Sequence, residues 1–354
     1  MNTSNEPAIT FELFVGDGKY NKKKSIIIPD APPWRRVQSQ HKNYRGSSFV
    51  VTAEVRSVVN AALHLRRPIL ITGDPGTGKS SVAYAVANEL GLGPVLKWPI
   101  NSRSTLKDGL YYYDAIARLQ DAQQKHFQNT RLKGETSYQT NVSSDRIGDY
   151  ITLGPLGTAM VASASSKPSV LLVDEIDKSD IDLPNDLLHV FEDGYFDIPE
   201  LLRLRSELRK SVEVFLMKEI DGNRRCIVKD GTVTCEEFPF VVLTNNGERE
   251  LPPAFHRRCL RLDLKLPNDN VDDQTSELHQ FLVKVVKQHL SDYELDLQDV
   301  NSLIEEFRQL RKGQQRTLAI DQLLQAVFLL RRNIQPTDDQ IEHLKKTLLR
   351  DLRA

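Results

Sequence analysis

The alternation of apolar and polar stretches along the chain predicts strands that alternate with helices. Apolar positions recur at helical spacing over residues 51–67, a short apolar run covers 68–72, and helical spacing returns over 80–90 before Gly91. A second apolar run, PVLKWPI, follows at residues 94–100. Because strands that alternate with helices assemble into a parallel sheet, we predict an α/β core over residues 49–267.

Three later segments have the composition of buried strands. They are SVLLVD at 169–174, FPFVVLT at 238–244 and CLRLDLKLP at 259–267, and the helical pattern LPNDLLHVFEDG lies between the first two. Two insertions are expected in this core. One is polar and mobile, near 120–149; the other, near 200–235, is charged and partly helical and ends in a hairpin that turns at Asp230 and Gly231.

Beyond residue 268 the pattern is helical throughout. Four amphipathic segments, at about 273–289, 297–310, 317–332 and 337–352, predict a small all-α domain over residues 268–354. Residues 1–48 form an N-terminal extension, which includes PDAPPWRR and a possible short hairpin near residues 16–18.

Composition and charge narrow the function classes. Among 354 residues, 47 Lys and Arg nearly balance 48 Asp and Glu, so no overall field attracts nucleic acid or an anionic membrane. No apolar stretch reaches the roughly 20 residues of a membrane span, and the start lacks a signal-peptide pattern, so we expect a cytoplasmic protein without membrane insertion.

The three cysteines, Cys226, Cys235 and Cys259, lack metal-ligand spacing, so zinc is not expected. The expected hairpin would place Cys226 opposite Cys235. Packed thiols are favoured over a disulfide there, because a cytoplasmic compartment is reducing.

The stretch GDPGTGKS at residues 73–80 fits the phosphate-binding pattern G-x-x-x-x-G-K-[ST], between a predicted strand and a predicted helix. Its glycines let backbone N–H groups approach phosphate, Lys79 reaches the terminal phosphates and Ser80 ligates magnesium. The motif alone does not exclude a kinase, a GTPase or a transporter. The residues expected to contact the nucleotide are Gly73, Asp74, Pro75, Gly76, Thr77, Gly78, Lys79, Ser80 and Ser81.

Carboxylates follow the predicted strand at residues 169–174. Asp174 is placed to hold Mg²⁺ through water, and Glu175 beside it is placed to polarise the attacking water as general base. Asp177 and Asp180 are expected to be solvated or to cap backbone groups rather than to catalyse.

The order of GDPGTGKS, LLVDEID, LTNN and LPPAFHRRC resembles the AAA+ ATPases, and within them the MoxR branch, whose group has insertions in helix 2 and before the second sensor. The resemblance extends from about residue 44 to the C-terminus. It implies a P-loop NTPase sheet of strand order 5-1-4-3-2 with helices on both faces, followed by a small α-helical lid domain. It also implies ATP hydrolysis with ATP and Mg²⁺ as cofactors.

By the same resemblance, Asn245 occupies the first-sensor position, where it would orient the attacking water together with Glu175; the adjacent Asn246 is the alternative. Arg258 matches the arginine finger better than Arg257 does. Such a finger brings positive charge to the γ-phosphate bound by a neighbouring subunit.

Arg316 is the best match for the second-sensor arginine, with a solvent-facing role as the alternative, because Gln314 and Gln315 replace the serine and proline often found before it. The tyrosines at 111–113 lie where the family has its helix-2 insertion. The resemblance therefore implies that they face a pore or a client protein, and the alternative is that they are part of the core. The residues expected to contact adenine are Tyr44, Gly46 and Phe49.

An arginine supplied in trans implies a homo-oligomeric ring or open spiral of about six subunits. MoxR-type proteins remodel or activate other proteins, often with a partner that bears a von Willebrand factor A domain. PPWRR at 32–36 and YDAIARLQDA at 113–122 also resemble MoxR-like ATPases of bacterial conflict systems that pair with such a partner. Two alternatives stay open: a nucleic-acid-stimulated AAA+ motor, which the acidic hairpin tip disfavours, and a slowly hydrolysing, nucleotide-gated scaffold.

Overall fold

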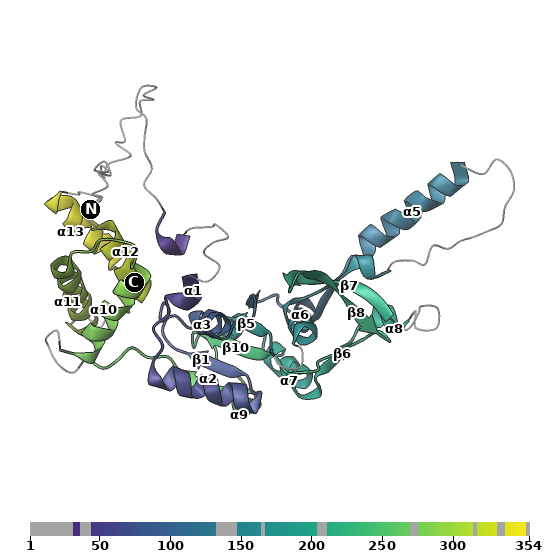
Figure 1. Cartoon of the computed structure of the whole chain (residues 1–354), viewed down its shortest axis with the longest axis horizontal. Helices are drawn as coiled ribbons and strands as arrows, with labels where there is room; N and C mark the ends of the chain where they lie inside the picture. Colours follow the sequence, from purple (N-terminus) through teal and green to yellow (C-terminus); the bar gives the residue numbers. More distant parts are fainter. Residues whose placement is uncertain are drawn as a thin grey trace, which may run out of the picture. The chain divides into compact units, whose positions relative to one another are not determined.

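The computed structural model describes residues 31–35, 44–131, 147–163, 167–203, 211–269, 275–313, 317–330 and 337–351. The chain divides into two compact units (Figure 1). The α/β unit comprises Ala53–Thr72 and Val82–Asp263, and the helical unit comprises Met1–Thr52, Gly73–Ser81 and Leu264–Ala354.

The α/β unit contains a five-stranded parallel sheet of order β11-β1-β10-β5-β2. Counted along the chain, this order is 5-1-4-3-2, so the expected topology is confirmed. The strands are β1 (Ile69–Thr72), β2 (Leu96–Pro99), β5 (Val170–Asp174), β10 (Phe240–Asn245) and β11 (Leu260–Asp263). Its central strands are almost wholly apolar because helices leave little of a parallel sheet exposed to water.

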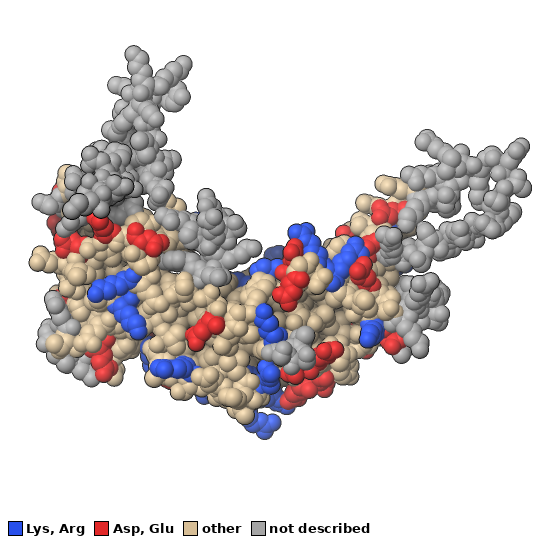
Figure 2. Space-filling view, viewed as in Figure 1, with Lys and Arg blue, Asp and Glu red and all other residues tan. Residues whose placement is uncertain are grey.

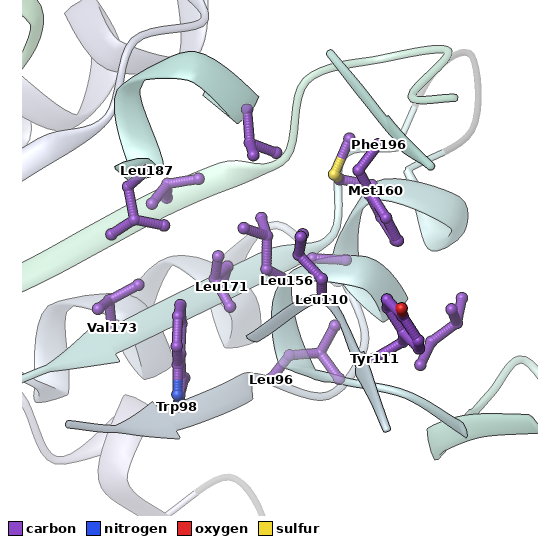
Figure 3. Close-up of a cluster of buried hydrophobic side chains, with 14 of the residues drawn as sticks. Leu96, Trp98, Leu110, Tyr111, Leu156, Met160, Leu171, Val173, Leu187 and Phe196 are labelled. Carbon is purple, nitrogen blue, oxygen red and sulfur yellow. The ribbon is translucent and has the colours of Figure 1, made fainter. Parts of the chain in front are cut away.

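Helices and 3₁₀ turns of the α/β unit pack against this sheet or against the second sheet described below. They are α2 (Ala53–Leu65), α3 (Ser81–Glu89), α4 (Leu106–Leu110), α6 (Pro155–Ala162), α7 (Leu183–Asp193), α8 (Pro199–Leu202) and α9 (Pro253–Arg258), with the 3₁₀ turns η3 (Ile147–Tyr150) and η4 (Ile176–Lys178). Figure 3 shows how Trp98 of β2, Leu171 of β5, Leu156 of α6 and Leu187 of α7 meet in one buried cluster. Burial of each such side chain contributes about 1.5–3 kcal/mol to the free energy of folding. The packing therefore holds β5, and with it the residues at its end, in a fixed position.

A second sheet of the α/β unit, of order β3-β4-β7-β8-β9-β6, was not predicted beyond one hairpin. Its strands are β3 (Tyr111–Tyr113), β4 (Ile151–Leu153), β6 (Tyr195–Asp197), β7 (Ser211–Ile220), β8 (Asn223–Lys229) and β9 (Thr232–Thr234). The expectation of a partly helical segment before residue 223 fits α8, whereas the extended strand β7 was not expected. Residues 204–210 lie outside the described ranges.

The predicted turn at Asp230 and Gly231 joins β8 to β9, and both residues have positive φ, 54° and 79°. The pairing of these strands stops at Lys229 and Thr232, so Cys226 does not lie opposite Cys235 as expected. Its cross-strand neighbour is Val214 of β7. Cys226, Cys235 and Cys259 are all free thiols.

The polar insertion expected near 120–149 begins as a helix. Helix α5 (Ala115–Arg131) extends away from the second sheet (Figure 1), and residues 132–146 lie outside the described ranges. The apolar pattern did not predict residues 120–131 as helical, because the side chains at 120–124 are exposed and a helix with an exposed surface needs no apolar stripe. Of the tyrosines before it, Tyr111 is buried in the core and Tyr112 is 65% exposed.

The helical unit contains the four helices expected near the C-terminus: α10 (Glu277–His289), α11 (Leu297–Gly313), α12 (Ile320–Leu329) and α13 (Asp338–Leu348). Their inward faces form a separate core around Leu282, Ile304 and Phe307, all fully buried. The short helices η1 (Pro33–Arg35) and α1 (Tyr44–Ser47) belong to the same unit, and the Trp34 ring packs edge-on against Phe328, with centroids 5.7 Å apart. The hairpin expected near residues 16–18 lies outside the described ranges.

The surface carries both signs of charge. On the face drawn in Figure 2, basic and acidic side chains are interspersed, in keeping with a formal net charge of −1. Across the described ranges, every helix is too short or too polar to cross a lipid bilayer.

Candidate functional site

The loop Gly73–Ser81 follows β1 in the chain and belongs to the helical unit. Gly73, Gly76 and Gly78 have φ values of 152°, 75° and 88°, which side chains with a Cβ rarely adopt. Lys79 is 7% exposed, and its Nζ donates to the carbonyl oxygens of Gly73 at 2.7 Å and Asp74 at 3.0 Å. The loop therefore curls around its own lysine ammonium.

Two segments of the helical unit pack closely on this loop. A Cβ built on Gly76 would lie 2.3 Å from the Ala319 Cβ, at the residue that precedes α12. A Cβ on Gly78 would lie 3.1 Å from the Phe49 ring, so one of the residues expected to contact adenine does neighbour the loop. Gly46, three residues before Phe49 in the chain, is buried.

Two expected site residues have no described side chain. Tyr44 opens α1, but its side chain is outside the described part of the structure. Arg316 lies outside the described residues altogether.

The residues present fit a nucleotide with Mg²⁺. The loop has the glycines that close approach of phosphate requires and a lysine at its centre. Ser80 and Asp174 offer the oxygen donors that Mg²⁺ prefers. Among the described residues no cluster of three or more His, Cys, Asp or Glu side chains could hold a metal ion.

In the α/β unit, Asp174 and Glu175 lie at the end of β5 and share one partner, Thr244 of β10. The Thr244 hydroxyl accepts from the Glu175 N–H at 2.8 Å and donates to Asp174 Oδ1 at 2.9 Å. The other oxygen of Asp174, Oδ2, lies 2.6 Å from the Lys97 ammonium of β2. Both carboxylate oxygens of Asp174 are thus engaged from neighbouring strands.

Glu175 adopts a left-handed backbone conformation with φ 64° and ψ 53°, which is strained by about 1–2 kcal/mol for a residue with a Cβ. Its Oε2 accepts from the Lys178 ammonium at 2.9 Å, and its Oε1 accepts from the Asn246 side-chain amide at 3.3 Å. The hydrogen bond to Glu175 raises the pKa of Lys178. Each oxygen of the Glu175 carboxylate therefore accepts a hydrogen bond from a different side chain.

The two asparagines after β10 face different partners. Asn245 is 5% exposed, is in register with Thr72 of β1, and accepts from the Gly247 N–H through its own Oδ1. Asn246, not Asn245, is the amide within hydrogen-bond distance of Glu175. Asn246, the alternative named for the first sensor, is thus the amide beside Glu175, and Asn245 remains the expected first sensor.

Asp177 is a buried cap and not a solvated residue. It is 3% exposed, and its Oδ2 accepts from the backbone N–H groups of Asn246 at 3.0 Å and Glu248 at 3.1 Å. Asp180 is exposed and accepts from the Ile181 N–H, which fits the capping role expected for it. Asp177 thereby ties the loop after β10 to the turn that carries Glu175.

Arg257 and Arg258 end α9 and are anchored by Arg67. The Arg67 guanidinium donates to the carbonyl oxygens of Arg257 and Arg258, at 2.5 and 3.2 Å, as a cap on the last turn of the helix. The Arg258 side chain forms an ion pair with Glu192 of α7, whereas Arg257 is exposed.

The AAA family model, described as the ATPase family associated with various cellular activities, matches residues 69–268. The chain belongs to the AAA family. The match covers β1 through β11 and includes Asp174, Glu175 and both asparagines.

Two solved structures resemble this AAA chain. The structure of NtrX from Brucella abortus in complex with ADP is 13% identical, with a TM-score of 0.40, and the match covers 83% of this chain and 54% of that one. The structure of PCH-2 from C. elegans is 14% identical, with a TM-score of 0.35, and the match covers 88% of this chain and 66% of that one. The chain thus spans about half of the first and just under two thirds of the second. No curated protein matches the chain.

Sequence reasoning missed several residues that contact the expected site of this AAA domain. A polar residue within an apolar strand was the available signal for Thr244, and an arginine directly before a strand was the signal for Arg67. The residues found only from the structure are Arg67, Lys97, Lys178, Glu192 and Thr244.

Proposed function

We propose that this AAA-family chain is a MoxR-like ATPase that couples the binding and hydrolysis of Mg·ATP at subunit interfaces to the remodelling or activation of a partner protein. In this proposal residues 49–267 form the nucleotide-binding core and residues 268–354 its lid, and the protein works in the cytoplasm on protein clients rather than on nucleic acid.

The register of three parallel strands carries the proposal. Thr72, the last residue of β1, pairs with Asn245 of β10, and β10 continues in register with β5, which ends at Asp174. The carboxyl ends of parallel strands in α/β sheets are where ligands bind. The phosphate-binding motif begins at the residue after Thr72, so this edge combines the residue types that ATP hydrolysis needs.

Each residue has a separate task in the proposed reaction. The loop N–H groups and Lys79 bind the phosphates, Ser80 and Asp174 hold Mg²⁺, and Glu175 takes a proton from the attacking water. When bound, Mg²⁺ supplies positive charge that stabilises the phosphoryl oxygens. Asn245 remains the proposed first sensor, and the contact with Glu175 supports Asn246 as the amide that orients this base.

Completion of the site by a second subunit is part of the proposal. Arg258, with Arg257 as the alternative, would approach the γ-phosphate of a neighbouring subunit in a ring or spiral of about six. Arg316 is proposed as the second sensor, and Tyr44, Gly46 and Phe49 as the adenine contacts. A partner with a von Willebrand factor A domain would be the client or its adaptor.

Two variants separate an ATPase from a nucleotide-gated scaffold. Lys79→Ala should lose nucleotide binding, while Glu175→Gln should bind a fluorescent ATP analogue like the wild type and lose hydrolysis by at least about a hundredfold. Hydrolysis is measured as phosphate release by the full chain over a range of concentrations, with and without DNA. Undiminished hydrolysis by Glu175→Gln would contradict the assigned base, and strong stimulation by DNA would favour the motor.

A mixing experiment tests the shared site. Arg258→Ala and Lys79→Ala should each be inactive alone, because one lacks the finger and the other the phosphate lysine. A mixture should regain part of the activity, since an interface between the two variants can pair an intact loop with an intact arginine. Persistent inactivity of the mixture in assembled rings would argue against an arginine supplied in trans.

A further inference from the structure

Thr244 is a fully engaged hydroxyl in a strand that is otherwise apolar up to that point. It is 1% exposed and lies on β10 one residue before Asn245. The Glu175 backbone N–H can only donate, so the Thr244 oxygen must accept from it. The single hydroxyl hydrogen is then left for Asp174 Oδ1, and the direction of both hydrogen bonds is fixed.

The first hydrogen bond holds the backbone of Glu175. That residue is left-handed without being glycine, a conformation that persists only where surrounding contacts impose it. Two contacts do so: the N–H donates to Thr244, and the carbonyl oxygen accepts from the Lys178 N–H at 3.0 Å. The direction of the Glu175 side chain follows from this turn.

The second hydrogen bond sets the plane of the Asp174 carboxylate. Thr244 occupies Oδ1, and Oδ2 faces the Lys97 ammonium at 2.6 Å. Oδ2 is therefore the oxygen directed toward a cation. A rotation of this carboxylate would exchange the two oxygens and lose the hydrogen bond to Thr244.

We propose that Thr244 is a positioning residue that aligns the metal-holding carboxylate of Asp174 and the base Glu175 with one hydroxyl group. This inference rests on the proposed ATPase function. It adds a buried residue from β10 that acts through the two carboxylates.

The chain offers a matched control for a merely structural role. Thr158 of α6 is also fully buried, and its hydroxyl donates to the Leu153 carbonyl oxygen and accepts from the Met217 N–H, both at 3.2 Å. Thr158→Val therefore removes the same pattern of one donated and one accepted hydrogen bond, with partners other than Asp174 and Glu175.

The experiment compares Thr244→Val, Thr244→Ser and Thr158→Val in the full chain. For each variant we would measure the melting temperature, kcat and KM for ATP, and the Mg²⁺ concentration that half-saturates binding of a fluorescent ATP analogue. Thr244→Val should lower kcat and raise the half-saturating Mg²⁺ concentration, each by about tenfold or more, because a carboxylate that loses its hydrogen-bonding partner holds the metal less well. Thr244→Ser should stay within about threefold of the wild type, since it keeps the hydroxyl.

Thr158→Val should lose thermal stability to a similar extent with kcat and Mg²⁺ dependence unchanged. The inference is overturned if folded Thr244→Val matches the wild type in both measurements, or if Thr158→Val shows the same losses. If Thr244→Val fails to fold, a comparison of Thr244→Ala with Thr244→Ser again contrasts a variant without the hydroxyl with one that keeps it. Normal hydrolysis by Glu175→Gln would instead refute the proposed base, and the Mg²⁺ measurement would still decide whether Thr244 acts on Asp174.

Discussion

Arg258 forms an ion pair with Glu192, a residue of helix α7 in the same chain. Arg258 is the proposed finger, so Glu192 competes with any phosphate for the guanidinium. The hydrogen bond from Arg258 also lowers the pKa of Glu192, so the pair is present above the usual pKa of a carboxyl group and is lost as the pH falls.

We therefore expect Glu192→Gln to raise the basal ATPase rate of the assembled protein by about two- to fivefold, because the finger is released from its intramolecular partner. Phosphate release at saturating ATP measures this rate, and Glu192→Asp is the control that keeps the charge. A loss of activity as large as that of Arg258→Ala would instead make Glu192 a support for the arginine.

The two asparagines should differ in what they contribute. Asn246→Ala should lower kcat by about tenfold or more with little change in melting temperature, because it removes the amide that holds Glu175. Asn245→Ala should also lower the melting temperature, because its buried side chain accepts from the Gly247 N–H. Steady-state kinetics and thermal unfolding of both variants make the comparison, and equal kinetic losses would assign both amides to the reaction.

Lys97 should oppose metal binding. Its ammonium lies on the oxygen of Asp174 that would face Mg²⁺, so the two cations compete for one carboxylate oxygen. We expect Lys97→Met to lower the Mg²⁺ concentration needed for half-maximal nucleotide binding by about three- to tenfold. Lys107→Met, which removes an exposed lysine that pairs with Glu200, is the control. A higher Mg²⁺ requirement in Lys97→Met would mean that Lys97 orients Asp174 instead.

The close packing of Gly76 on Ala319 predicts a steric effect beyond backbone strain. Gly76→Ala would meet the Ala319 Cβ at 2.3 Å, whereas Gly93, which has a similar φ of 85°, has open space around it. Both variants should lose about 1 kcal/mol from the left-handed backbone, and Gly76→Ala should lose more. Chemical denaturation measures the difference in the free energy of unfolding. Adding Ala319→Gly to Gly76→Ala should restore part of the lost stability in the double variant. Equal losses at both positions would contradict the packing.

The cysteines should be slow to react in the folded protein. Burial raises the pKa of Cys226 and Cys235 from 9.0 to about 11, and that of Cys259 to about 12. At pH 8 the thiolate fraction, and with it the alkylation rate, should be below that of the unfolded chain by about a hundredfold for Cys226 and Cys235 and about a thousandfold for Cys259. Mass spectrometry after iodoacetamide treatment, with and without urea, measures this difference.

The same thiols affect stability at high pH. Because their pKa values are higher in the folded than in the unfolded state, their contribution to stability is present below pH 9 and is lost as the pH rises through about 11 for Cys226 and Cys235 and about 12 for Cys259. Urea unfolding across this range should show the loss, and replacement of all three cysteines by Ala should flatten it.

The sequence predicted the central sheet well, because β1, β5 and β10 are apolar runs and the neighbouring helices show clear helical spacing. The second sheet was not predicted, because β3, β4, β6 and β9 have only three residues each, too few to show an alternation. Strand β7 had a usable signal, since Val212, Val214 and Leu216 alternate with residues that face outward, but its charged residues suggested a helix. The motifs indicated the candidate site residues but not the contacts that these residues make.

The contacts of the site lie between residues that are far apart in the chain. Thr244 lies 70 residues from Asp174, and Asn246 lies 71 residues from Glu175. Strand order and register bring these pairs together, and the final side-chain directions depend on single hydrogen bonds. The sequence therefore predicted neither the contact of Asn246 with Glu175 nor that of Thr244 with Asp174.

The left-handed backbone of Glu175 has a consequence for engineering this protein. Glycine adopts such a conformation without penalty, so Glu175→Gly would relieve the strain while removing the proposed base. Activity and heat resistance therefore favour different residues at this one position. A selection for thermal tolerance alone would tend to enrich variants that no longer turn over ATP.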